Sequence, residues 1–334
     1  MKKIYDLVGI GIGPFNLGLA ALAQSHTNLK CLFFDKKTVF NWHINMILPG
    51  TRLQVPFHAD LVTLADPKSD YSFLAYLKAK RRLFRFTIRE GQFPLRWEYN
   101  DYCKWVVEQL NTLRFGYSCE DISYDHQRAC YRVKVRQGAL KRTRIYWSRR
   151  LVIGVGTVPS VPDFIDPTMP GVFHSENYLE NKHDLLSGHT ITIVGSGQSA
   201  AEIFNELLDL KPETPRQIFW YTRSARFYPM DYTKFSLEMT SPDYIDHFFK
   251  LSVATKRSIL ENQNGLYKGI NAALIETIYD KLYERSLDRP GRNNVHLCPN
   301  VSLKGTKPLA GGLNAPFSIM KQKRILNMAL TDLF

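Results

Sequence analysis

The sequence predicts an α/β fold, because two segments far apart in the chain repeat the order of buried strand, glycine turn and helix. The first segment spans residues 3–25 and the second spans residues 189–210. Each helix is followed by another short apolar run, at 29–35 and at 216–224. The order of strand, helix and strand is typical of parallel sheets with crossover helices. We therefore expect two Rossmann-like dinucleotide-binding domains.

The other elements lie between and after these two units. Periodicity and turn residues predict helices at 69–81 and 99–111, strands near 128–138 and 143–156, a proline-rich loop at 157–171, and a mostly helical segment at 242–289.

Length and composition restrict the class of function. The chain has 334 residues, 44% hydrophobic content and a formal net charge of +13. It has no apolar run of membrane-spanning length, and its five cysteines and nine histidines lack the spacing of metal ligands. Scattered cysteines without a C-x-x-C pair favour a reducing compartment. We expect a cytoplasmic protein with no metal site, no membrane partner and no nucleic-acid partner, and we interpret the basic run at 78–90 as a solvated cationic face.

The first glycine turn has the chemistry of a phosphate site. Gly9, Gly11 and Gly13 let the backbone approach a pyrophosphate, and the next helix offers free N–H groups and the positive end of its dipole. The glycine expected three residues after Gly13 is replaced by Asn16. The second strand ends in Asp35, whose carboxylate accepts hydrogen bonds from an unphosphorylated ribose and repels a 2′-phosphate. The first site therefore fits FAD or NAD, and a solvated strand-end charge is the alternative for Asp35.

The second glycine turn differs at the end of the following strand. Gly195 and Gly197 form the turn, and Gln198 and Ser199 follow at positions that reach a phosphate or cap the helix. The next strand ends without an acid and has Arg223 between two hydroxyl residues, which suits a ribose 2′-phosphate. The second site therefore fits NADPH, and a surface ion pair is the alternative role for Arg223.

These residues make the chain resemble the flavin-dependent N-hydroxylating monooxygenases of siderophore biosynthesis, the family of lysine N6-, ornithine N5- and diamine N-hydroxylases. The segments that carry the resemblance cover nearly all of residues 4–300 and include "GIGPFNLGLA", "FNWHINM", "LQVPFHADLVTLADPKSDYSFLAYL", "LVIGVGTVPSVP" and "TITIVGSGQSAAEIF". The FAD turn of this family carries asparagine in the third place, so Asn16 matches the family's variant. The resemblance implies an FAD-binding domain at 1–185, an inserted NADPH-binding domain with a helical substrate segment at 186–300, and a remnant of the FAD domain at 301–334.

The resemblance also implies the chemistry and the contacts. NADPH reduces FAD, O₂ adds to form a C4a-hydroperoxyflavin, and a neutral primary amine attacks the distal oxygen, so no catalytic side chain is expected. Trp42, His43 and Gln54 are expected near the flavin ring, although Trp42 has the alternative of a core residue. The other expected FAD contacts are Gly9, Gly11, Gly13, Pro14, Asn16 and Asp35, and the expected NADPH contacts are Gly195, Gly197, Gln198, Ser199 and Arg223.

Ala59 and Asp60 are the expected substrate residues. Amino-acid hydroxylases of this family are expected to have a lysine where this chain has Ala59, and that lysine meets the substrate's α-carboxylate. A substrate without a carboxylate loses nothing by the change. We therefore expect a diamine such as putrescine or cadaverine. Histamine, L-lysine and L-ornithine stay open, because Ala59 has the alternative of simple packing, with selectivity set elsewhere.

The chain departs from the family after residue 301. A strand ending in A-T-G-Y is missing, and "GGLNAP" and "RILN" follow as a degraded form of the last family motif, without the histidine expected before Gly312. We interpret this as an internal deletion that shortens the FAD domain. One alternative is therefore a truncated paralogue that is uncoupled or inactive. Another class B flavin monooxygenase stays open on separate grounds, because such enzymes also have two nucleotide turns. A homo-oligomer also stays open.

Overall fold

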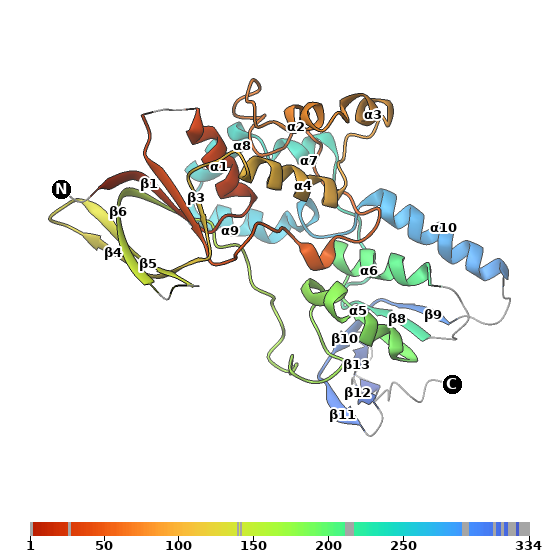
Figure 1. Ribbon diagram of the computed structural model, residues 1–334. Coiled ribbons are helices and arrows are strands. Elements are labelled where there is room, and N and C mark those ends of the chain that lie inside the picture. The colour runs from red at the N-terminus through yellow and green to blue at the C-terminus, as the bar shows by residue number, and fades with distance from the viewer. Residues whose placement is uncertain are drawn as a thin grey trace. The chain divides into compact units, whose positions relative to one another are not determined.

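The computed structural model describes residues 3–25, 28–138, 140, 142–210, 217–288, 294–309, 312–314, 317–319 and 325–326. The chain divides into two units, residues 1–158 and 159–334, and each is described by itself. Figure 1 shows the helices and strands of both units. The domain bounds expected from the sequence stay a prediction.

The first unit is built on one six-stranded sheet in the order β3-β2-β1-β6-β5-β4. The central strand β1 runs parallel to β2 and to β6, and β4, β5 and β6 are antiparallel neighbours. The strands are β1 (Ile4–Ile10), β2 (Cys31–Asp35), β3 (Leu113–Phe115), β4 (Tyr117–Asp125), β5 (Cys130–Gln137) and β6 (Arg142–Ile153).

The two faces of this sheet bury alternate residues of β2, as a strand period of two requires. Cys31 and Phe33 belong to a core cluster with the helices, whereas Leu32 and Phe34 pack with valines of β5. The helical elements of the first unit are α1 (Pro14–Gln24), η1 (Ile44–Met46), α2 (Phe73–Ala79), α3 (Leu83–Ile88) and α4 (Arg96–Val107). β1 lies between β2 and β6 and runs parallel to both, and α1 connects β1 to β2. This arrangement confirms the predicted α/β fold.

The second unit contains a smaller parallel sheet in the order β7-β8-β9. Its strands are β7 (Thr190–Val194), β8 (Gln217–Tyr221) and β9 (Val295–Cys298). Four consecutive residues of β8, Ile218 to Tyr221, are buried, as expected for a central strand covered on both faces. The helical elements are η2 (Ser175–Asn177), α5 (Tyr178–Ser187), α6 (Gln198–Leu208), α7 (Lys234–Glu238), α8 (Pro242–Lys250), α9 (Val253–Asn262), η3 (Asn264–Leu266) and α10 (Ala272–Asp288).

Short antiparallel strands follow β9. They are β10 (Val301–Leu303), β11 (Lys307–Leu309), β12 (Gly312–Asn314), β13 (Phe317–Ile319) and β14 (Ile325–Leu326). β13 pairs with β10 and β14, and β11 pairs with β12. The degraded family motif at 311–316 and 324–327 lies partly outside the described residues.

Candidate functional site

Two glycines of the first turn are required by close packing. A Cβ added at Gly9 would lie 2.2 Å from Cδ1 of Phe33 on β2. A Cβ at Gly11 would lie 2.2 Å from the carbonyl oxygen of Gly154, and Gly11 has a φ of +86°. Side chains at these two positions would therefore push β1 away from its neighbours. These glycines bring the strand ends together beneath the turn.

The third glycine leaves open space at the start of α1. Gly13 is the N-cap residue and Pro14 is in the first turn, and no side chain caps the helix. A Cβ at Gly13 would meet no atom within 4 Å. Since the first N–H groups of a helix have no partner inside the helix, this end can bind an anion.

Asn16 explains why the usual third glycine is absent. Its side chain is buried, and Nδ2 donates to the carbonyl oxygens of Ile10 at 3.2 Å and Gly11 at 2.7 Å. A Cβ at Gly154, just after β6, would lie 2.6 Å from that Nδ2. The space for the amide thus comes from a glycine on the return strand, and the amide ties α1 to the glycine turn.

Asp35 lies at the end of β2 and contacts the same turn. Its Oδ2 accepts from the backbone N–H of Ile12 at 2.7 Å, and Oδ1 accepts from that of Lys37 at 2.8 Å. Each carboxylate oxygen keeps a lone pair for a further donor. The structure therefore brings together the glycine turn, Asn16 and Asp35, as the sequence predicts.

Trp42 and His43 lie in a turn that α4 supports. The Trp42 ring contacts His43 at 4.6 Å and Tyr99 at 5.2 Å between centroids, both edge to face. The backbone N–H of Trp42 donates to Oδ1 of Asn100 at 3.0 Å. His43 is exposed, with a left-handed φ of +49°, and begins η1. Trp42 is half-buried against the core, so the structure is compatible with both its core and its flavin-facing roles.

Gln54 has a free donor. It lies in a segment that pairs with residues 92–95, through hydrogen bonds such as Leu53 N–H to the Pro94 carbonyl at 2.9 Å. Its Nε2 is buried and has no hydrogen-bond partner among the described residues. Leaving such a donor unpaired costs about 1–3 kcal/mol. A ligand acceptor would remove this cost, which is consistent with the predicted contact to the flavin.

The carboxylate of Asp60 accepts hydrogen bonds from its own loop and from the start of α2. Oδ1 accepts from the N–H groups of Val62 at 2.9 Å and Thr63 at 2.7 Å, and Oδ2 accepts from the Thr63 hydroxyl at 2.7 Å and the Phe73 N–H at 2.6 Å. These four bonds give the carboxylate a role in holding the segment that carries Ala59. Ala59 itself is half-buried, and its N–H donates to the Pro56 carbonyl at 2.9 Å.

The second glycine turn leaves open space at the start of its helix, as Gly13 does in the first turn. Gly195 has a φ of +125° and Gly197 is the N-cap of α6, with no capping side chain. A Cβ at either position would meet no atom within 4 Å. The Gly195 carbonyl accepts from Nε1 of buried Trp220 at 2.6 Å, which holds the turn against β8.

Gln198 and Ser199, the first two residues of α6, differ in whether their side chains have partners among the described residues of the unit. Gln198 is used inside the unit, because Nε2 donates to Glu202 at 2.8 Å and Oε1 accepts from the Asn271 N–H at 2.8 Å, just before α10. Ser199 follows in the first turn and is half-buried. Gln198 therefore anchors α10, a role that the sequence did not indicate.

The end of β8 holds an exposed cation. Thr222 is buried and donates to the Ser196 hydroxyl at 3.0 Å, and it accepts from the Ser224 N–H at 3.1 Å. Arg223 between them is exposed, and it forms no ion pair within the described ranges. The structure thus brings Arg223 to the edge where the second glycine turn lies.

A buried charge network in the first unit was not predicted from sequence. Arg82 forms an ion pair with Glu98, which is 3% exposed, and donates to the Tyr76 hydroxyl at 3.3 Å. That hydroxyl donates to Asp101 at 2.6 Å. Burial raises the pKa of Glu98, although Arg82 and then Arg89 oppose this. The members of this network come from α2, from the start of α3 and from α4. Sequence spacing alone could not identify it, because it depends on how these helices pack.

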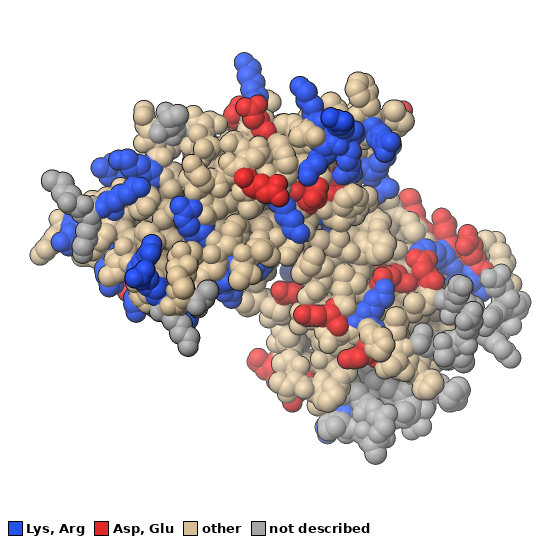
Figure 2. Space-filling model, viewed as in Figure 1, with Lys and Arg blue, Asp and Glu red and all other residues tan. Residues whose placement is uncertain are grey.

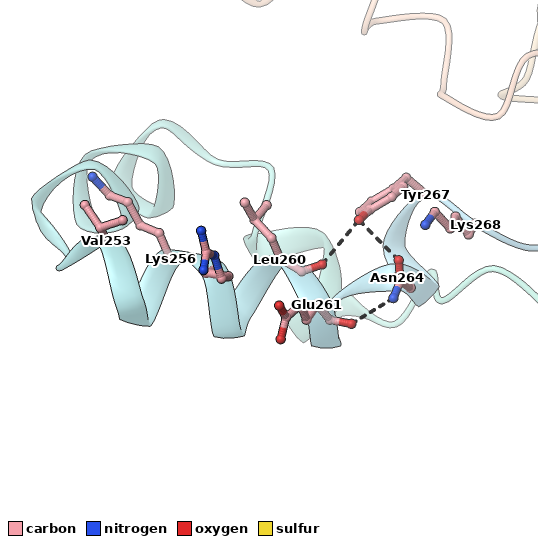
Figure 3. A pocket seen from close by; sticks show the side chains of 8 residues that line it. Val253, Lys256, Leu260, Glu261, Asn264, Tyr267 and Lys268 are labelled. Carbon is pink, nitrogen blue, oxygen red and sulfur yellow. Dashed lines mark hydrogen bonds between the residues drawn. The ribbon is translucent and has the colours of Figure 1, made fainter. Parts of the chain in front are cut away.

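A surface groove of about 560 Å³ lies beside α9 in the second unit and is shown in Figure 3. Tyr267 closes one end, where its hydroxyl lies 3.5 Å from the Leu260 carbonyl oxygen and 3.4 Å from Oδ1 of Asn264, and either oxygen can accept its single hydrogen. None of its lining residues belongs to the predicted cofactor sites.

Within the described part of the chain, no three His, Cys, Asp or Glu residues are grouped so that they could hold a metal ion. Over the same residues, no helix has the length and apolar character needed to span a bilayer.

Comparison with known proteins identifies relatives along nearly the whole chain. The family model described as L-lysine 6-monooxygenase/L-ornithine 5-monooxygenase matches residues 3–329. A putrescine N-hydroxylase from Shewanella oneidensis is 45% identical over 98% of this chain, which spans 65% of that protein's length. A putrescine N-hydroxylase from Acinetobacter baumannii is 45% identical over 95% of this chain and 70% of its own length. A crystal structure of a cadaverine monooxygenase from Erwinia amylovora, bound to FAD, has a TM-score of 0.93 at 44% identity and covers 97% of this chain and 76% of that one.

Proposed function

We propose that this chain, which belongs to the L-lysine 6-monooxygenase/L-ornithine 5-monooxygenase family, uses FAD, NADPH and O₂ to hydroxylate the nitrogen of a small primary amine. The observation that carries the proposal is the pair of uncapped helix N-termini, one beside Asp35 and one beside Arg223. An acid at the first strand end favours a bare ribose, and a cation at the second favours a phosphorylated one. The reaction belongs to siderophore biosynthesis in the cytoplasm.

The residues fit both cofactors. The open space above Gly13 and Gly197 is what a pyrophosphate at a helix N-terminus needs. The unpaired Nε2 of Gln54 offers a donor to a flavin acceptor, and the Trp42 ring offers an apolar surface. Bound FAD, once reduced by NADPH, supplies the electrons that activate O₂ for transfer of one oxygen atom to the amine. The chain's own part is to hold the cofactors, orient the amine and exclude water.

We propose a diamine as the substrate, because the loop carrying Ala59 has no cation at that position for an α-carboxylate. The relatives named as putrescine and cadaverine enzymes support this choice. Asp60 contributes by anchoring that loop through its four hydrogen bonds. An Ala59→Lys variant should therefore lose turnover with putrescine and gain turnover with L-ornithine or L-lysine. An unchanged ratio of kcat/KM values would assign selectivity to other residues.

The test of the reaction uses the purified full chain with added FAD. NADPH oxidation is followed with putrescine, cadaverine, histamine, L-lysine and L-ornithine in turn, and hydroxylamine and peroxide are both measured. Hydroxylamine formed from a diamine supports the proposal. The absence of both flavin binding and NADPH oxidation would reject it.

A second outcome is favoured by the residues that follow position 301, where the sequence departs from the family. The family's last motif is degraded here. If the flavin site is open to water, the same assay would give NADPH oxidation and peroxide without hydroxylamine. That result would identify an uncoupled relative that keeps both cofactor sites.

A further inference from the structure

The basic run at 78–90 contributes to neither cofactor site. It contains the end of α2, a turn in which Arg81 has a left-handed φ of +56°, and the short helix α3. From sequence alone it is expected to be a solvated cationic face. In Figure 1, α2 and α3 lie at the edge of the first unit farthest from β4 and β5.

The aromatic residues of α3 divide between two faces. Phe86 is buried and contacts Phe57 and Phe73, each at 5.5 Å between ring centroids. Phe84 is 83% exposed and Ile88 is 77% exposed. Because these two residues are four apart, they share one face of the helix. Phe86 thus anchors α3, and two large apolar side chains point to solvent.

Exposed cations accompany this apolar pair in the same stretch of chain. Lys78, Lys80, Arg81 and Arg85 are all exposed, and none forms an ion pair among the described residues. Figure 2 shows the resulting cluster of Lys and Arg over α2 and α3. We call Lys78, Lys80, Arg81, Phe84, Arg85 and Ile88 the cationic–apolar face.

We infer that the cationic–apolar face binds the surface of an anionic lipid bilayer. Exposed cations attract the headgroups, and a helix that presents Phe and Ile beside them can insert these side chains at the acyl boundary. A single-stranded nucleic acid would instead need a groove with several stacking rings. On this helix, Phe84 is the one exposed ring, and its neighbour Ile88 cannot stack. The attachment is peripheral, departs from the sequence-based expectation of no membrane partner, and does not depend on the proposed oxidation.

The structure sets the size of the expected effects. Each lysine or arginine near an anionic surface changes the partition constant about fivefold. Removing the apolar pair should lower it at least about tenfold. Since the four cations are exposed, binding should weaken steeply as salt shortens the Debye length.

The test is co-sedimentation of the full chain with vesicles of phosphatidylcholine alone or with phosphatidylglycerol. We expect binding to the anionic vesicles only. It should be lost in Phe84→Ser/Ile88→Ser and weakened in Arg81→Gln/Arg85→Gln. The matched controls are Phe235→Ser, which removes a ring that is 92% exposed on α7, and Arg257→Gln/Lys268→Gln, which removes two exposed cations of the second unit. Both controls should bind as the parent does.

Three results would overturn the inference. The first is no binding to anionic vesicles at low salt. The second is equal binding by the parent and the Phe84→Ser/Ile88→Ser variant. The third is a self-associated form, seen by size exclusion without lipid, that this variant abolishes while vesicle binding is unaffected; the face would then join two copies of the chain. Melting curves of each variant establish that it is folded.

Discussion

Asn16 should be needed for the stability of the first glycine turn, although a glycine is usual at its position. Asn16→Gly removes both side-chain hydrogen bonds to the strand end. The Ile10 carbonyl keeps a donor, the Gly154 N–H at 2.7 Å. The Gly11 carbonyl loses the hydrogen bond from the Asn16 side chain, and the space that the Asn16 amide filled is left empty.

The expected loss follows from these contacts. An unsatisfied buried acceptor costs about 1–3 kcal/mol, and glycine in a helix costs up to about 1 kcal/mol more. Asn16→Gly should therefore lower the free energy of unfolding by about 1–4 kcal/mol. Asn16→Asp keeps the shape but puts a carboxylate oxygen against two carbonyls. The pKa of that Asp should rise in the folded state, so its penalty appears as the pH rises above about 4.

Gly154 supplies an independent check by a double-mutant cycle. Gly154→Ala puts a Cβ 2.6 Å from Nδ2 of Asn16 and should cost about 1–3 kcal/mol. In the Asn16→Gly background that clash is absent, so Gly154→Ala should cost less than about 1 kcal/mol.

Unfolding of the cofactor-free chain by denaturant, followed by tryptophan fluorescence, measures these values. Of the five tryptophans, Trp42, Trp97, Trp105 and Trp147 lie in the first unit. The control is Asn262→Asp, whose amide donates to a helix carbonyl at 2.8 Å in the open, where water can replace it. If Asn16→Gly is as stable as the parent, or if the Gly154→Ala cost is the same in both backgrounds, the assigned role of Asn16 is wrong.

Three other predictions follow from the described contacts. Asp35→Ala removes the acceptor of the turn and of the proposed ribose contact, so it should weaken FAD binding at least about tenfold in a flavin-fluorescence titration. An unchanged affinity would contradict the ribose role. Arg223→Ala should raise KM for NADPH at least about tenfold and leave that for NADH unchanged, while Arg226→Ala serves as a control of equal charge. Arg82→Met should cost about 3 kcal/mol near pH 7 by leaving Glu98 buried without its partner. Because the pKa of Glu98 is raised, that cost should shrink as the pH falls and Glu98 takes up a proton, and a pH-independent loss would contradict it.

The sequence by itself determined the two strand, glycine turn and helix units, because those signals are local and periodic. Glycine spacing, the acid ending β2 and the cation after β8 are all readable within a few residues of each turn. The family resemblance and the α/β fold rest on the same local signals, and the comparisons confirm both.

Only the tertiary structure decided which distant groups meet. Gly154 is far from Asn16 in sequence, yet its missing Cβ makes room for the amide. Gln198 was expected to reach a phosphate or to cap the helix, but its amide nitrogen donates to Glu202 within α6 and its amide oxygen accepts from the Asn271 N–H just before α10. The short helix α3 could have buried either Phe84 or Phe86, and contacts from other segments decided the choice. Side-chain partners depend on the packing of elements far apart in the chain, and local periodicity carries no record of that packing.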